Sequence, residues 1–123
     1  MLRARARHVV TENARVREVV AILQSGWDPR SIGPILTRGH GSLRDDFAVS
    51  TPQLDAAVEA SCDSGAHGAR MTGGGFGGSV IALAEADSSA RIGTAVAQHF
   101  SAQHWPIPQV FVVTPSDGAR RIR

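Results

Sequence analysis

The chain has 123 residues, of which 42% are hydrophobic and 20% are charged, a composition typical of one compact domain and not of a multidomain enzyme. All 13 basic residues are arginines. Because the sequence has no lysine, it excludes a Walker phosphate-binding loop, a protein-kinase ATP site and a Schiff-base mechanism for this chain.

Charge and residue usage further limit the partners and cellular locations that we expect for this protein. The formal net charge is only +2 and aromatic residues make up 5% of the chain, so we expect no nucleic-acid partner. The single cysteine, Cys62, cannot form an internal disulfide, and we expect it to have a packing role. No apolar run approaches a membrane span and no signal peptide is recognisable, so we expect no membrane partner and a cytoplasmic location.

The first helix is predicted over residues 6–24. Its apolar side chains recur at helical spacing on one face, which we expect to be buried: Val9, Val16, Val20 and Leu23, widened by Val19 and Ile22. Gly26 follows where a C-terminal cap is expected.

Two more helices are predicted in the first half of the chain. Ser31 is a cap candidate for a helix within residues 28–42, whose buried side would carry Ile35, Leu36 and Leu43. The next helix starts with a hydroxyl cap and a proline at its first position, and Gln53 is placed to complete a capping box from Ser50. We expect this helix to end near Gly65.

The second half alternates strands with one helix. Residues 69–72, 79–84 and 109–113 are predicted strands, and a helix after residue 87 would carry Ile92, Ala95, Val96, His99 and Phe100 at helical spacing. The predicted fold class is therefore α+β, with a small sheet of at least three strands covered on one face by helices. If residues 79–84 and 110–113 pair in parallel, they form a right-handed crossover.

A glycine-rich loop, residues 73–78, joins the first two predicted strands and reads Gly-Gly-Gly-Phe-Gly-Gly. Successive glycines present bare backbone N–H groups and adopt any φ, so such a loop can wrap an anion such as phosphate. The dinucleotide-binding motif fails here because a strand follows the loop, and the Walker and protein-kinase loops fail for want of a lysine. A flexible tight turn between strands is the alternative interpretation.

The residues around this loop resemble a known family. Residues 68–78, which read Gly-Ala-Arg-Met-Thr before the glycine run, are similar to the third motif of the GHMP kinases in the form typical of galactokinases. Residues 5–13, 42–47, 51–55 and 117–121 are similar to galactokinase segments in the same order. The sequence departs from many relatives at Ser79, where they have cysteine, and at Gly39 and Gly41, which flank His40.

The resemblance implies that residues 1–123 form a GHMP kinase C-terminal domain of ferredoxin-like architecture. It implies a complete enzyme that transfers the γ-phosphoryl group of ATP to the C1 hydroxyl of galactose with magnesium, and whose catalytic aspartate and ATP loop belong to an N-terminal domain outside this chain. We therefore expect no catalytic residue, no metal ligand and no bound cofactor in the chain alone. The phosphate-proximal residues would be Thr72, Gly73, Gly74, Gly75, Phe76, Gly77, Gly78 and Ser79.

Several other side chains are candidates for a functional or structural role. Arg70 either donates to a phosphate or pairs with an acid in a domain interface. His40 is interpreted as a structural, hydrogen-bonded histidine, and the adjacent acids Asp45 and Asp46 as a solvated turn with Arg44 as partner. Trp27 and Trp105 are expected to cover the core or an interface.

Two other functional classes stay open at this point. The chain is either a non-catalytic module that holds a phosphorylated metabolite or docks on a partner, or a decayed kinase fragment. Since further sheet partners are expected outside the chain, we also predict an open edge strand and, with it, poor solubility or dimerisation.

Overall fold

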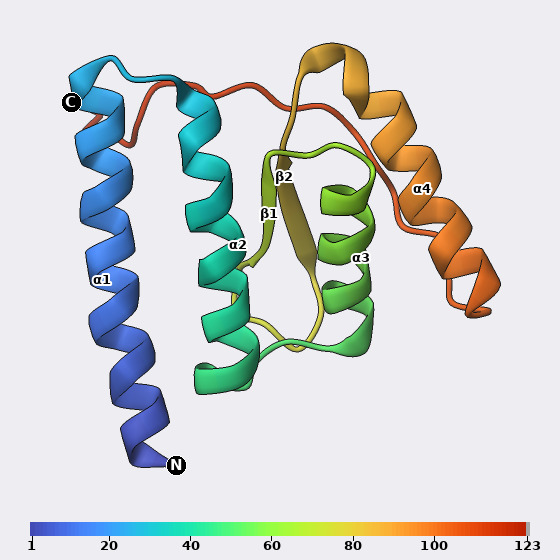
Figure 1. Ribbon diagram of the computed structural model, residues 1–123, viewed down its shortest axis with the longest axis horizontal. Helices are drawn as coiled ribbons and strands as arrows, with labels where there is room; N and C mark the ends of the chain where they lie inside the picture. The colour runs from blue at the N-terminus through green and yellow to red at the C-terminus, as the bar shows by residue number, and fades with distance from the viewer. Residues whose placement is uncertain (123) are drawn as a thin grey trace.

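Four α-helices and one two-stranded antiparallel sheet are found in residues 1–122, the part of the chain that the computed structural model describes. In chain order they are α1 (Leu2–Ser25), α2 (Ile32–Ser42), α3 (Pro52–Asp63), β1 (Gly68–Thr72), β2 (Ser79–Leu83) and α4 (Ser89–Ala102). Helices α1 and α2 lie side by side, the sheet follows, and α3 and α4 complete the row (Figure 1). The predicted α+β class is confirmed.

Helix α1 turns a different face inward from the one that its apolar spacing predicts. The aliphatic stripe is exposed, with Val9 at 52%, Val16 at 55% and Leu23 at 60%. The face toward α2 instead carries the buried His8 and polar side chains that find partners on other elements. The prediction of a buried stripe is wrong because periodicity identifies an apolar face but not which neighbour covers it.

The predicted hydroxyl cap and first-position proline of helix α3 are confirmed, but the predicted capping box is not. The Thr51 hydroxyl accepts a hydrogen bond from the Leu54 amide at 3.2 Å, and Pro52 occupies the first helical position. The Ser50 hydroxyl donates instead to the Asp55 carboxylate at 2.6 Å. The capping box from Ser50 to Gln53 is therefore wrong, because a carboxylate on the first turn of the helix competes for the serine.

The outer edge of β1 is covered by α2. The Ala69 amide donates to the Thr37 hydroxyl at 3.2 Å and the Met71 amide donates to the His40 ring at 3.1 Å. Two glycines allow this approach, since a Cβ at Gly68 would lie 1.8 Å from the Gly33 carbonyl oxygen. Side chains of α2 thus satisfy edge amides that would otherwise lie unpaired in the interior.

Strand β2 is the more open edge of the sheet. It pairs with β1 from Gly68 opposite Leu83 to Thr72 opposite Ser79. All five of its residues are exposed or half-buried, whereas three of the five in β1 are buried. In the described chain, β1 is the one strand that pairs with β2, so the expected open edge is found there.

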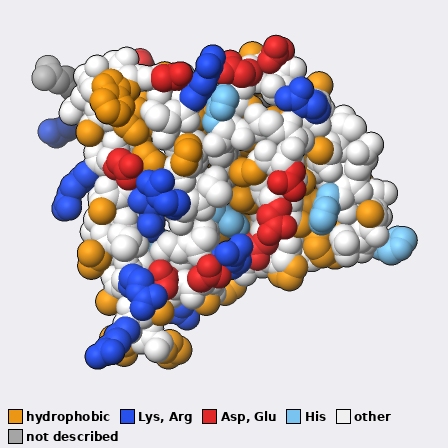
Figure 2. Space-filling model, in the orientation of Figure 1, with side chains coloured by type: hydrophobic (Ala, Val, Ile, Leu, Met, Phe, Trp, Pro, Cys, Tyr) orange, Lys and Arg blue, Asp and Glu red, His pale blue; other side chains and the backbone are white. Residues whose placement is uncertain are grey.

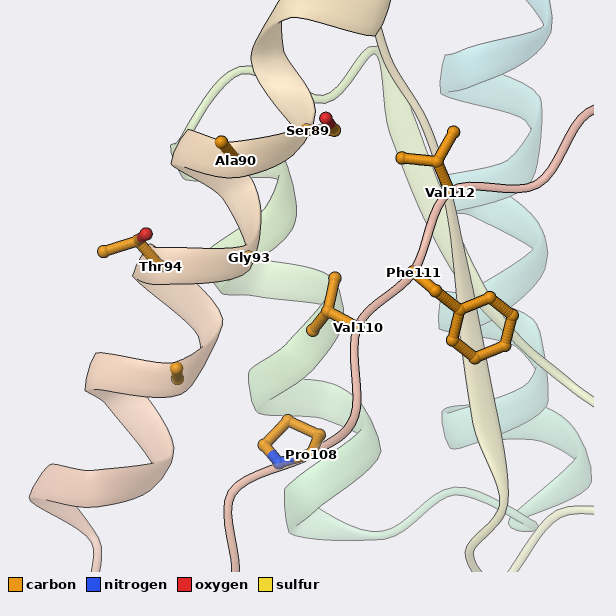
Figure 3. A pocket seen from close by; sticks show the side chains of 9 residues that line it. Ser89, Ala90, Gly93, Thr94, Pro108, Val110, Phe111 and Val112 are labelled. Carbon is orange, nitrogen blue, oxygen red and sulfur yellow. The ribbon is translucent and has the colours of Figure 1, made fainter.

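The predicted third strand and its crossover are not formed. Residues 109–113 run back along α4 without strand structure, and Val110 approaches Gly93 so closely that a Cβ there would lie 3.3 Å from a valine methyl. Figure 3 shows Val110 pointing toward α4 and Phe111 pointing away from it. The segment keeps strand-like alternation, but a strand requires a hydrogen-bonding partner strand, and none pairs with it in residues 1–122.

The core consists of two apolar clusters on either side of α3. The first joins Leu43, Val49, Leu54 and Met71 beside the glycine-rich loop. The second joins Ala56 of α3 to α4 through Ile92, Val96 and Phe100. Trp105 packs edge-on against Phe100 as expected, but Trp27 is 70% exposed. No helix in the described chain is both long and apolar enough to cross a bilayer.

Candidate functional site

The glycine-rich loop connects β1 to β2 through a succession of left-handed backbone conformations. Gly73, Gly75, Gly77 and Gly78 have φ of 85°, 88°, 141° and 99°. Phe76, the single side chain among them, has φ of 60° and is 74% exposed. φ is positive at four consecutive residues, Gly75 to Gly78, and a glycine-rich backbone of this kind leaves most of its N–H groups unshielded by side chains, so an anion can approach them closely.

One contact fastens the loop to the body of the domain. The Phe76 amide donates to the Val49 carbonyl at 2.7 Å, and a Cβ at Gly75 would meet that same oxygen at 2.6 Å. A Cβ at Gly73, Gly74, Gly77 or Gly78 would meet nothing within 4 Å. The loop is therefore held at its centre and open to solvent on either side.

Val49 is placed by an unusual turn after α2. Residues Leu43–Phe47 form a π-helical turn, Ala48 follows with φ of 58°, and the Val49 amide donates back to the Leu43 carbonyl at 3.1 Å. Single π-helical turns are frequent at functional sites. Here the turn delivers the Val49 carbonyl to the loop.

A buried relay aligns the strand that enters the loop. His40 accepts from the Met71 amide through Nδ1 and lies 2.8 Å from Asp55 through Nε2. Because Nδ1 accepts, the ring proton is on Nε2 and points to the Asp55 carboxylate, which also accepts from Ser50. The interpretation of His40 as a structural, hydrogen-bonded histidine is confirmed.

Arg70, the charged residue nearest the loop in sequence, pairs with an acid. Its Nη1 lies 2.6 Å from Oε1 of Glu12 in α1, and Oε2 of the same carboxylate accepts from Arg15 at 2.8 Å. Burial by itself would raise the pKa of Glu12, but the hydrogen bonds from Arg70 and Arg15 outweigh it and hold the pKa below its ordinary value. A phosphate contact by Arg70 would require sharing or breaking this pair.

A second histidine lies under the π-helical turn. His8 Nδ1 is 2.9 Å from the Ser42 hydroxyl, and its ring stacks on Phe47 with centroids 4.7 Å apart. Burial lowers the pKa of His8, so the neutral ring is the favoured form. The contact joins α1 to the end of α2.

The adjacent acids do not form a metal site. Asp45 pairs with Arg44 at 2.8 Å, and Asp46 pairs with Arg7 of α1 at 2.9 Å. The hydrogen bond from Arg44 lowers the pKa of Asp45. Within residues 1–122, no three His, Cys, Asp or Glu side chains gather in a way that could hold a metal ion.

Sequence reasoning placed the loop but missed what supports it. Val49, Asp55 and Glu12 were not singled out, although each makes a contact that positions the loop or its entering strand. The contact pairs 40–55 and 12–70 join segments far apart in the chain, so no local motif could have revealed them.

Comparison with known proteins agrees with this architecture. A family profile described as GHMP kinases C terminal matches residues 19–102. The galactokinase of Streptomyces coelicolor is 54% identical over 121 residues, which is 98% of this chain and 31% of that protein. The galactokinase of Pyrococcus furiosus is 44% identical over 111 residues, covering 90% of this chain and 31% of that protein.

Solved structures give the same result. The crystal structure of Lactococcus lactis galactokinase complexed with galactose superposes with a TM-score of 0.76 at 38% identity, covering 84% of this chain and 27% of that one. The chain thus spans about a third of the length of the curated relatives that it matches. Sequence motif, fold and all three comparisons agree, and the chain belongs to the GHMP kinase family, whose C-terminal domain it carries.

Proposed function

We propose that residues 1–123 are the C-terminal part of a galactokinase. The observation that carries this proposal is the 54% identity to a galactokinase over 98% of the chain. In the complete enzyme, the C1 hydroxyl oxygen of galactose bonds to the γ-phosphorus of ATP, the bond from that phosphorus to the β–γ bridging oxygen breaks, ADP leaves and the hydroxyl proton is released. The Lactococcus lactis galactokinase structure is a complex with galactose, which supports the choice of sugar.

The contribution of this chain is the glycine-rich loop and its flanks, residues 72–79. Phosphoryl transfer depends mainly on positioning and on stabilising negative charge, and backbone N–H groups aimed at a phosphate do both without a charged side chain. The open backbone on either side of the Val49 anchor fits this role, because a phosphate can approach glycine amides closely.

The groups that make the bond are proposed to lie outside the chain. The sequence has no lysine to grip a nucleotide, and the described residues offer no cluster of acids for magnesium. Since curated relatives are about three times as long, an N-terminal domain has ample length to supply both. We therefore propose that the chain alone is inactive.

The test compares the chain alone with a chimera. In the chimera, these 123 residues replace the matching third of the Streptomyces coelicolor galactokinase. We expect no turnover of ATP and galactose by the isolated chain and clear turnover by the chimera, measured as galactose 1-phosphate formed. Turnover by the isolated chain, or none by a folded chimera, would contradict the proposal.

Calorimetry separates this proposal from a stand-alone binding module. The isolated chain is titrated with ATP and with galactose 1-phosphate. We expect at most millimolar affinity, since the loop forms only one side of a binding site. Micromolar binding of either ligand by the chain alone would instead favour a module that holds a phosphorylated metabolite.

A further inference from the structure

The outward face of α1 carries a continuous apolar seam. Leu2, Val9, Val16 and Leu23 recur every seven residues along the 24-residue helix and are all more than half exposed. Val20, 44% exposed, lies between the last two. Figure 2 shows exposed hydrophobic and basic side chains close together along its left margin, where α1 lies.

The spacing of this seam is that of a helix-packing face. Its members are Leu2, Ala6, Val9, Asn13, Val16, Val20 and Leu23, and their separations alternate strictly between four and three residues. A three-four alternation keeps side chains in line against a second helix. A single asparagine in such a seam is a device that fixes the register of the partner at some cost in stability. At 1.5 Å per residue, α1 offers a track of about 36 Å.

The two flanks of the seam differ. On the inner flank, Arg5, Glu12 and Val19 are half-buried on the side of α1 that packs on α2. On the outer flank, Arg3 and Arg17 are exposed, and neither pairs with a carboxylate within residues 1–122. A partner helix must therefore lie against the seam on its outer flank, and carboxylates on that helix opposite Arg3 and Arg17 would favour binding.

A second copy of this chain meets that requirement poorly. An antiparallel copy would set the arginine-bearing flank against the same flank of its partner, which like charges oppose. A parallel copy would need the inner flank, whose Glu12 is already paired with Arg70 and Arg15. The two thirds of a galactokinase that this chain lacks are a better source of the partner.

We infer that the α1 seam is the docking face for an α-helix with an apolar three-four repeat and an acidic flank, contributed by the remainder of the complete kinase. This inference rests on the proposed function in so far as it takes the chain to be part of a longer protein. In this inference, α1 joins the domain that carries the glycine-rich loop to the remainder of the complete kinase.

The test introduces carboxylates on two faces of the same helix. Val16→Glu with Val20→Glu alters the seam, and Ala14→Glu with Ala21→Glu is the control at exposed positions outside the seam. In the chimera, the seam pair is expected to lower the Tm by about 5 °C or more, since carboxylates would be buried without partners, and the control pair by about 1 °C or less. In the 123-residue chain alone, both pairs should leave the Tm nearly unchanged.

A labelling experiment gives a readout that does not depend on the stability of a charged variant. Val16→Cys and Ala14→Cys are each introduced with Cys62→Ala, and the alkylation of the new thiol is followed by peptide mass spectrometry. In the chimera, the thiol at position 16 is expected to react at about one tenth of its rate in the chain alone, or more slowly still, because the reaction then requires local opening of the interface. Position 14 should react equally fast in both.

The inference would be overturned if position 16 were alkylated at equal rates in the two proteins, or if the seam pair of substitutions left the Tm of the chimera unchanged. It would also be overturned if the isolated chain formed a dimer that the seam pair dissociates while the same pair had no effect in the chimera, because the seam would then bind a second copy. A chimera with a protected seam and no kinase turnover would contradict the proposed function alone. Turnover with an accessible seam would contradict the docking face alone, and a chimera that does not fold would contradict both.

Discussion

The glycines of the glycine-rich loop differ in whether they can be replaced by a residue with a side chain. Gly75 lies against the Val49 carbonyl with φ of 88°, whereas Gly74, its neighbour in sequence, has open space around its Cα and no left-handed φ. Loop composition alone makes the two look equivalent, but only one of them is required by the contact that holds the loop.

Gly75→Ala should therefore disturb the loop and Gly74→Ala should not. The added methyl at 75 would clash with backbone 2.6 Å away and would adopt a strained φ. We expect a loss of about 1–3 kcal/mol in the free energy of unfolding for Gly75→Ala and about 0.5 kcal/mol or less for Gly74→Ala. Urea denaturation of the two variants measures this, and equal effects would contradict the anchoring role of Val49.

The His40 relay makes a second prediction at this scale. His40→Phe removes the acceptor for the buried Met71 amide and the donor to Asp55. Leaving these groups unpaired should cost about 2–4 kcal/mol of unfolding free energy, because each loses the compensation for its desolvation. Hydrogen exchange should show faster exchange of the Met71 amide.

The control for this prediction is His104→Gln, at an exposed position. It should leave both the unfolding free energy and the Met71 exchange rate as they are in the unaltered chain. If His40→Phe behaves like the control, the relay does not align β1.

Among the elements, α1 is held to the rest of the domain mainly by polar contacts. Its aliphatic stripe faces outward, and the bonds that cross to β1 and to the end of α2 come from Glu12 and His8. Polar contacts of this kind are directional but contribute little free energy each. The isolated chain therefore relies on a few of them to orient a 24-residue helix.

Glu12→Gln should weaken this attachment at neutral pH. The Glu12 carboxylate forms ion pairs with Arg70 and Arg15, and all three side chains are 23% exposed or less. We therefore expect a loss of about 1–2 kcal/mol in the free energy of unfolding. Glu18→Gln is the control, because its pair with Arg38 is about half exposed and its loss should cost about 0.5 kcal/mol or less.

The pH dependence of Glu12 follows from the direction of its pKa shift. Its pKa is lower in the folded chain than the ordinary 4.5, so the stabilisation is complete above that value and disappears as the pH falls through the folded pKa. In urea denaturation from pH 7 to pH 3, the difference between the unaltered chain and Glu12→Gln should therefore shrink below about pH 4.5. A difference that stays constant would contradict the ionic origin of the contact.

At the scale of the whole molecule, three apolar features face outward: the α1 seam, the edge of β2 and the C-terminal segment 109–113. Within that segment Val110, Phe111, Val112 and Val113 are between 54% and 72% exposed. Extended, alternating and apolar, it has the residue pattern of a strand and runs along α4, but it pairs with no strand in the described chain.

Hydrogen exchange should divide the isolated chain accordingly. The amides of residues 110–113 are expected to exchange nearly as fast as those of an unstructured peptide, because no strand in the described chain accepts their hydrogen bonds. The β1 amides of Ala69 and Met71 should be strongly protected, since α2 side chains accept from them in a buried environment. Strong protection of residues 110–113 would show that this segment joins a sheet after all.

Local signals in the sequence accounted for most of the elements. Helix starts at proline and hydroxyl residues, the C-cap at Gly26 and the strands on either side of the glycine run depend on nearby residues, and these predictions agree with the structure to within a few positions. The buried side of α4, with Ile92, Val96 and Phe100, also followed from spacing, because this apolar face is the one that packs on α3, although His99 of the same predicted face is exposed.

The sequence by itself therefore determined the α+β class, the position of the glycine-rich loop and, through the lack of lysine, the need for other groups to hold a nucleotide. Tertiary structure alone decided which face of α1 is buried, which acid pairs with Arg70 and whether residues 109–113 become a strand. The physical reason is that propensity, capping and backbone freedom act over a few residues, whereas burial and pairing depend on neighbours that the fold brings from distant parts of the chain.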